Sequence, residues 1–181
     1  VLTLSGTDSI ANYQAALRAV TYQNTSDAPN TPNRTISFTI NDGDTNSTAA
    51  TRIISITSVN DAPTVTQNGA AINYAENDSA TAIVPAITIV DDETNIESAT
   101  LSISSNFTQG QDILAFTNTA NITGSFNAQT GVLTLTGTDT VANYQAALRA
   151  VTYRNTSEDP TEVAKTVSII INDGDVNSNT A

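Results

Sequence analysis

The sequence predicts an all-β protein made of tandem β-sandwich domains, with one short helix in each repeat. Three observations predict this fold class: a composition dominated by Thr, Ser, Asn, Ala, Ile and Val, short runs in which apolar and polar residues alternate, and a long internal repeat. Such a chain is rich in strand formers and poor in the long side chains that favour helices. Apolar residues make up 39% of the 181 residues, which is enough to fill the thin core between two sheets.

The internal repeat has a period of 131 residues, since residues 11–22 recur unchanged as residues 142–153. Residues 1–8 likewise recur as residues 132–139, with one substitution. About two-thirds of positions 1–50 are identical to positions 132–181. This period exceeds the roughly 20–45 residues of a solenoid repeat. Each repeat is therefore expected to be a domain with its own core.

Runs of alternating or β-branched residues, bounded by Asn, Asp, Gly or Pro, predict the strands. In chain order they are residues 1–4, 35–40, 53–57, 86–90, 99–103 and 166–171. A series of short strands separated by turn residues is typical of a sandwich.

A short helix is predicted within residues 138–149. Thr138 or Asp139 is expected to cap its N-terminus. The apolar positions recur at helical spacing, so that they share one face, which we expect to pack over a sheet edge. These positions are Val141, Tyr144, Ala147 and Leu148.

The linker between repeats is predicted at residues 59–63, because its proline ends strand pairing and its Asn and Asp side chains cannot join a core. Residues 1–58 are then the C-terminal part of one repeat, and residues 64–181 are the next repeat, lacking its last strand. The first repeat continues into a β-branched run at residues 51–57, which the second does not reach. The unpaired sheet edge that results has two explanations. Either the sequence is a window onto a longer array, or a neighbouring chain donates the strand.

Charge excludes several classes of partner. Eighteen acidic residues against six basic residues give a net charge of −12. This charge repels nucleic acid and anionic membranes and favours divalent cations. No run approaches the roughly 20 apolar residues that span a bilayer. We therefore expect no nucleic-acid binding and no membrane insertion by this segment.

Enzymatic activity is not expected. The chain has no His and no Cys, which removes the usual general bases, thiol nucleophiles and zinc ligands. A glycosidase-type pair of carboxylates remains, but it requires a cleft that holds two acids about 5–10 Å apart. Acids at strand ends beside a linker suit that arrangement poorly.

Acidic and amide residues gather in the linker, around Glu76, in the run 91–93, and in two copies of Asn-Asp-Gly-Asp at 41–44 and 172–175. Calcium takes six to eight oxygen ligands of this kind. Asp91 and Glu93 are expected to point the same way at a strand end, with Asp92 opposite. If the strand ends meet the linker, the repulsion between their carboxylates costs roughly several kcal/mol unless a cation neutralises them. Taken singly, each cluster is equally well explained as a solvated turn.

Together these motifs resemble the bacterial cadherin-like repeats of large surface and biofilm adhesins. The matching pieces are Tyr-Ala-Glu-Asn at 74–77, Ile-Val-Asp-Asp-Glu at 89–93, the strand 126–135, Ile-Asn-Asp-Gly at 171–174 and Val-Asn-Asp-Ala-Pro at 59–63. The resemblance implies Greek-key sandwiches with Ca²⁺ between successive domains. It departs from the family where Glu93 replaces a second Asp, and where a helical insert carrying Asp8 or Asp139 replaces an upstream Asp-x-Glu motif.

Position by position, the resemblance implies that the linker, the downstream domain and the following junction each supply calcium ligands. Asp92 and Asp42 join the candidates as members of the same acidic clusters. The full set is Asn60, Asp61, Glu76, Asp91, Asp92, Glu93, Asp173 and Asp42.

The sequence therefore predicts an extracellular or cell-surface protein, a calcium-stiffened structural repeat of an adhesin, stalk or filament. Its expected partners are neighbouring repeats of the same chain and like chains in a filament or matrix. The alternative is a repeat that itself binds a glycan or a partner-cell protein through its loops.

Overall fold

The computed structural model describes residues Val1–Ala181, which form two compact units, Val1–Ser58 and Val59–Ala181. No helix in either unit is long and apolar enough to cross a membrane.

The first unit has one helix and one pair of strands. Helix α1 (Ile10–Arg18) begins at Ser9, whose side chain accepts a hydrogen bond from the Asn12 N–H. Strands β1 (Arg34–Phe38) and β2 (Ala50–Ile54) pair antiparallel, with Arg34 opposite Ile54 and Phe38 opposite Ala50. No residue of α1 is buried, so this unit has secondary structure without a closed core.

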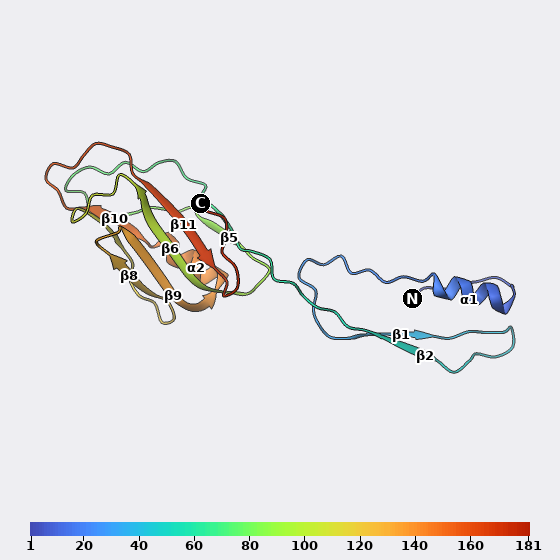
Figure 1. The fold of residues 1–181 in the computed structure, drawn as a ribbon. Coiled ribbons are helices and arrows are strands. Elements are labelled where there is room, and N and C mark those ends of the chain that lie inside the picture. The colour runs from blue at the N-terminus through green and yellow to red at the C-terminus, as the bar shows by residue number, and fades with distance from the viewer. The chain divides into compact units, whose positions relative to one another are not determined.

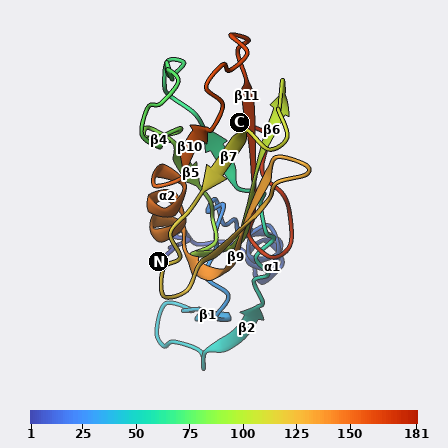
Figure 2. The same ribbon diagram turned by 90° about the vertical axis from the view of Figure 1, so that its left-hand side faces the viewer.

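The second unit contains two facing sheets, as Figures 1 and 2 show. The larger sheet has the order β11-β6-β9-β8, from Thr166–Asn172, Asn95–Ser105, Val132–Thr140 and Thr123–Asn127, and all its pairs are antiparallel. The smaller sheet has the order β4-β10-β7, from Thr81–Ala82, Thr152–Asn155 and Asp112–Ala115. A separate pair joins β3 (Thr64–Thr66) to β5 (Thr88–Val90).

The core lies between these sheets and is filled by alternate residues of each strand. In β6, Ala99, Leu101 and Ile103 are buried while the residues between them point outward. Leu133 and Leu135 of β9, Leu114 of β7, and Ile169 and Ile171 of β11 complete the same layer. The period of two is what the alternating sequence runs predict for a sheet with one buried face. The expectation of sandwich-like sheets is confirmed.

Helix α2 (Val141–Arg149) closes one side of the core and packs against β5, β9 and β6 (Figure 2). The residue that caps it is Thr140, whose hydroxyl accepts from the Asn143 N–H. The predicted caps Thr138 and Asp139 are wrong, because β9 continues through them to Thr140.

The predicted apolar face of the helix is correct. Tyr144, Ala147 and Leu148 are buried and Val141 packs against the core. The Tyr144 hydroxyl donates to the Gly137 carbonyl at 2.5 Å, which ties the helix to the strand before it.

The predicted strand at residues 1–4 is absent, although its near-identical copy forms the first half of β9. In the second unit that segment pairs with β6 on one side and β8 on the other. The first unit contains no counterpart of either partner. A strand requires a ladder to satisfy its backbone groups, so the same residues remain irregular there.

The sequences of α1 and α2, identical except at their first residue, provide a matched test of core burial. Leu148→Ala removes a side chain with no exposed surface and is expected to lower the free energy of unfolding of the second unit by about 2–5 kcal/mol. Leu17→Ala, the same change on α1, is expected to cost much less because no residue of α1 is buried. Urea unfolding followed by circular dichroism measures both. Equal effects of the two substitutions would contradict this assignment of the core.

Candidate functional site

Three segments of the second unit meet at the end where the chain enters it, which we call the linker pole (Figure 1). The Asn60 side-chain amide donates to Asp173 Oδ2 at 2.9 Å. The Asp61 N–H lies 3.3 Å from Asp92 Oδ1. The linker is thereby held to the turn that follows β11 and to the bend that follows β5.

The turn after β11 fixes the direction of the Asp173 carboxylate. Its Oδ1 accepts from the N–H groups of Asp175 and Val176 at 2.8 and 2.7 Å. Gly174 has a φ of +113°, a conformation that favours glycine. Because Oδ1 is occupied by the turn, Oδ2 is the oxygen directed to the linker.

Asp42 of the first unit forms the same turn, and its Oδ1 accepts from the N–H groups of Asp44 and Thr45 at 3.0 and 2.9 Å. The Asn-Asp-Gly-Asp sequence is thus a turn in both units, and in the second unit its first Asp also accepts a hydrogen bond from Asn60.

Asp91 has the least favourable electrostatic environment of the carboxylates at the linker pole. Its Oδ2 is a buried atom with no hydrogen-bond partner. Burial, followed by the charges of Asp173 and Asp92, raises the pKa of Asp91 to about 6. Burial also opposes ionisation of Asp173, but hydrogen bonds from Asn60, Val176 and Asp175 outweigh it and lower the pKa of that group. At neutral pH the pole therefore holds like charges close together.

The structure brings together Asn60, Asp61, Asp91, Asp92 and Asp173, five of the predicted site residues. The strand predicted to carry Asp91 and Glu93 is wrong at its end, because β5 ends at Val90 and Asp92 and Glu93 lie in a bend. Asp92 is consequently the one that contacts the linker, and Glu93 is exposed.

Glu76 lies away from the linker pole. The turn that carries it is held by Tyr74, whose hydroxyl donates to the carbonyls of Asp78 and Asn155. Asn155 contacts Asp112, which pairs with Lys165 immediately before β11. This is the opposite end of β11 from Asp173, so Glu76 belongs to a different pole.

One acid at the linker pole was not predicted. Glu97 faces the Asp173 turn: a Cβ placed on Gly174 would lie 2.9 Å from its carboxyl carbon. Glu97 sits at a β-bulge of β6, between Ile96 and Ser98. A bulge redirects side chains locally, and simple alternation of the sequence does not reveal it.

No group of three or more acidic side chains is arranged around a common point that would hold a metal ion. The donors present are nevertheless carboxylate and amide oxygens, the ligand type that Ca²⁺ takes. The unpartnered Oδ2 of Asp91 is the atom best suited to a cation.

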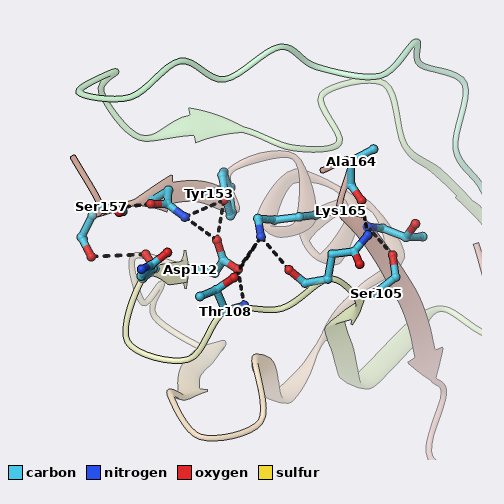
Figure 3. Close-up of polar contacts among 12 residues, drawn as sticks. Ser105, Thr108, Asp112, Tyr153, Ser157, Ala164 and Lys165 are labelled. Atoms are coloured by element: carbon cyan, nitrogen blue, oxygen red, sulfur yellow. Dashed lines mark hydrogen bonds and ion pairs between the residues drawn. The ribbon is translucent and has the colours of Figure 1, made fainter. Parts of the chain in front are cut away.

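A second polar cluster, at the opposite pole, also escaped the sequence analysis (Figure 3). Lys165 Nζ lies 2.9 Å from Asp112 Oδ2, and the Asp112 side chain has no exposed surface. Tyr153 and Asn155 donate to Asp112 Oδ1 at 2.6 and 2.7 Å. The Thr108 N–H donates to Oδ2 at 2.6 Å. Burial opposes ionisation of Asp112, but these donors outweigh it and lower its pKa.

This cluster joins the two sheets. Asp112 begins β7 of the smaller sheet, and Lys165 immediately precedes β11 of the larger one. The chain has no cysteine, so no disulfide joins the sheets. The ion pair and its hydrogen bonds are the polar connection between them, and we call it the inter-sheet clasp.

The comparisons with known proteins relate the chain to one stretch of a very large protein. A segment of Halomucin from Haloquadratum walsbyi (strain DSM 16790 / HBSQ001) is 36% identical over 101 residues, covering 52% of this chain and 1% of Halomucin. The chain therefore spans a very small part of that protein's length. No protein-family model and no solved structure matches the chain.

The inter-sheet clasp predicts a large cost for removing its cation. Lys165→Met leaves the buried Asp112 without its counter-charge and is expected to lower the free energy of unfolding by about 3 kcal/mol. Lys165→Arg keeps the charge, and Arg34 stands at the equivalent position of the first unit. Chemical denaturation of the two variants measures the difference. If the Met and Arg variants are equally stable, the clasp contributes little.

The raised pKa of Asp91 predicts a distinctive pH dependence. The folded chain holds this proton more tightly than the unfolded chain, so Asp91 reduces stability as the pH rises from 3.8 to about 6. Above that range the loss is complete and constant. We expect Asp91→Asn to be more stable than wild type at pH 7, with the difference vanishing near pH 4. Thermal unfolding in chelator-containing buffer tests this, and a difference independent of pH would contradict it.

Proposed function

We propose that this chain is part of an extracellular structural repeat in a long cell-surface protein, and that the linker pole binds Ca²⁺. The similarity to a segment that makes up 1% of Halomucin, and therefore lies within a very long protein, supports the structural role. The repeat of a domain-sized unit within one chain supports it independently.

The observation that carries the calcium proposal is the unpartnered oxygen of Asp91. A buried carboxylate oxygen without a donor costs free energy, and the neighbouring Asp173 and Asp92 increase that cost. A divalent cation removes both costs at once, because it is a partner for the buried Oδ2 of Asp91 and neutralises the repulsion among the three carboxylates. A solvated turn, the other interpretation of these acids, leaves the buried Oδ2 unexplained.

Binding at this position would stiffen the linker. Asn60 and Asp61 belong to the linker, whereas Asp91, Asp92 and Asp173 belong to the body of the domain. A cation shared between the two sets fixes the direction in which the chain enters the domain. In a chain of such repeats, that constraint converts flexible joints into rigid ones, which is the property an extended surface stalk requires.

The test is calcium-dependent stability with matched variants. We expect Ca²⁺ to raise the melting temperature of the second unit, with half-saturation at about 10⁻⁴–10⁻³ M as in extracellular modules. Asp173→Asn, which keeps the turn but removes a charge, is expected to abolish most of this increase. Asp42→Asn makes the same change in the equivalent turn of the first unit, and is expected to leave it intact.

Isothermal titration of the same variants with Ca²⁺ measures binding directly. An unchanged melting temperature in excess EDTA and in Ca²⁺, with no heat of binding, would exclude the calcium site. It would leave the structural role of the repeat to be tested separately.

A further inference from the structure

The outer face of the larger sheet has no part in the core, the linker pole or the inter-sheet clasp. Its four strands, β11, β6, β9 and β8, lie side by side in Figure 1. The residues that alternate with the core residues point outward, and the strand register places them in three rows that cross all four strands. We call these residues the hydroxyl face. The rows are Asn172, Ser98, Thr136 and Thr123; Ile170, Thr100, Thr134 and Ser125; and Ser168, Ser102, Val132 and Asn127.

The hydroxyl face carries no charged residue. Eight of its twelve residues are Ser or Thr, and the others are Asn, Val and Ile. All twelve are exposed or half-buried. The chain as a whole has 18 acidic and 6 basic residues, and the outer face of the smaller sheet carries the exposed Arg154. Along the strands of the larger sheet, the acids Glu97 and Asp173 lie beyond the first row, at the linker pole. The face is therefore an uncharged surface in a strongly acidic chain.

The internal repeat preserves this lack of charge. Six positions of the hydroxyl face have a counterpart 131 residues earlier, and only two of them differ between the copies. Thr136 replaces Ser5 and Ile170 replaces Thr39, so both positions stay uncharged. Elsewhere the second copy gains charges: Arg154, Asp159 and Glu162 stand where the first copy has Gln23, Ala28 and Thr31. Charge thus varies across the repeat but does not enter this face.

The chemistry of the hydroxyl face makes it complementary to itself. A Ser or Thr hydroxyl both donates and accepts hydrogen bonds, so two identical faces can pair with each other. An interface between two copies related by a two-fold axis requires such self-complementarity, and sheets pack face to face in this way within sandwiches. No aromatic side chain, on which a sugar ring would stack, lies on the face. These properties favour a second copy over a glycan.

Electrostatics favours the same partner at the same surface. A net charge of −12 makes two copies of the chain repel each other. Contact through an acidic surface would bring carboxylates together, which opposes association. Contact through the hydroxyl face brings none together. From these observations we propose that the hydroxyl face binds the hydroxyl face of a second copy of this chain, sheet against sheet. The inference does not depend on the proposed calcium site, because no residue of the face is among the calcium ligands.

The size of the hydroxyl face predicts weak association of this chain. Strands about 4.8 Å apart and rows about 6.7 Å apart give roughly 400 Å² on each copy. Such an interface is at the low end for specific complexes, so we expect a dissociation constant of about 10⁻⁴–10⁻³ M. In a protein that repeats the domain, several of these contacts act together and bind much more tightly.

A charge-swap experiment with the full chain tests the proposal. Thr134 lies in the middle row on an inner strand, so a charge placed there meets the same charge of the second copy. We expect Thr134→Glu and Thr134→Lys each to associate at least about tenfold more weakly than wild type. An equal mixture of the two variants is expected to associate more tightly than either alone, because opposite charges then face each other. Sedimentation equilibrium over a concentration series measures all four samples.

Matched controls come from the outer face of the smaller sheet. Thr152 lies on the middle strand of that sheet, between Ala82 and Ala115. Thr152→Glu and Thr152→Lys make the same changes there and are expected to leave association unchanged. Circular dichroism checks the fold of each variant. If the Thr134 variants do not fold, amide resonances of wild type are followed as its concentration rises. We then expect shifts in β6 and β9 and none in β7 and β10.

Four outcomes overturn the proposal. They are a wild type that stays monomeric at about millimolar concentration, a Thr134 mixture no tighter than its components, Thr152 variants that weaken association as much as the Thr134 variants do, and amide shifts confined to the smaller sheet. Association that weakens as salt is added also overturns it, since that would indicate contact between charges. A monomeric wild type that binds dextran, with binding lost in Thr134→Glu, would assign the face to a neutral glycan instead.

Discussion

Burial of alternate side chains between two sheets is the constraint on which the rest of this structure depends. In the second unit the strands of both sheets are present, so Leu101, Leu133 and Ile169 meet in one layer without exposed surface. The same layer provides the surface on which α2 buries Tyr144 and Leu148. Helix α1 has the same sequence from Ala11 onward, but its unit lacks the facing sheet, and it buries nothing. Helix formation here is local, whereas helix burial is a property of the complete sandwich.

The polar features of the second unit are arranged along β11. At its start, Lys165 joins the two sheets through Asp112. At its end, Asp173 joins the domain to the linker through Asn60. The two ends differ in electrostatic balance. Asp112 has four donors and its pKa is lowered, while Asp91 near Asp173 has an unpartnered oxygen and its pKa is raised. The polar groups around Asp112 are therefore satisfied by one another, whereas the linker pole holds a buried carboxylate oxygen without a hydrogen-bond partner.

Sequence reasoning succeeded where a pattern is local or repeated. The helical spacing of Tyr144, Ala147 and Leu148 sufficed to predict the buried face of α2, and alternation predicted the buried residues of β6. It failed where tertiary context decides. Residues 1–4 alternate as well as their copy does, yet have no ladder partner. The strand expected to carry Asp91 and Glu93 ends before them, so Asp92 took the place predicted for Glu93.

Two further failures concern residues that meet only in three dimensions. Glu97 reaches the linker pole because a bulge redirects it. Asp112 and Lys165 come from different sheets and are distant in sequence. No short sequence motif predicts an ion pair between residues so far apart in the chain. The repeat gave one indirect sign of it: Arg34 stands at the position of Lys165, so both copies keep a cation there although residues 30–33 and 161–164 differ throughout.

That repeated cation explains how a domain without disulfides holds its sheets together. With only six basic residues in 181, most positions of the chain carry no positive charge, and a cation retained at the same place in both copies has a specific role. In the second unit its role is to neutralise a carboxylate with no exposed surface. Removing either partner leaves the other charge without its counter-charge inside the domain, so the clasp and the sandwich depend on each other. The Arg34 guanidinium instead contacts carbonyls of its own loop, including that of Asn30 at 3.1 Å. No buried acid lies in the first unit for this cation to pair with, and α1 likewise buries no residue there.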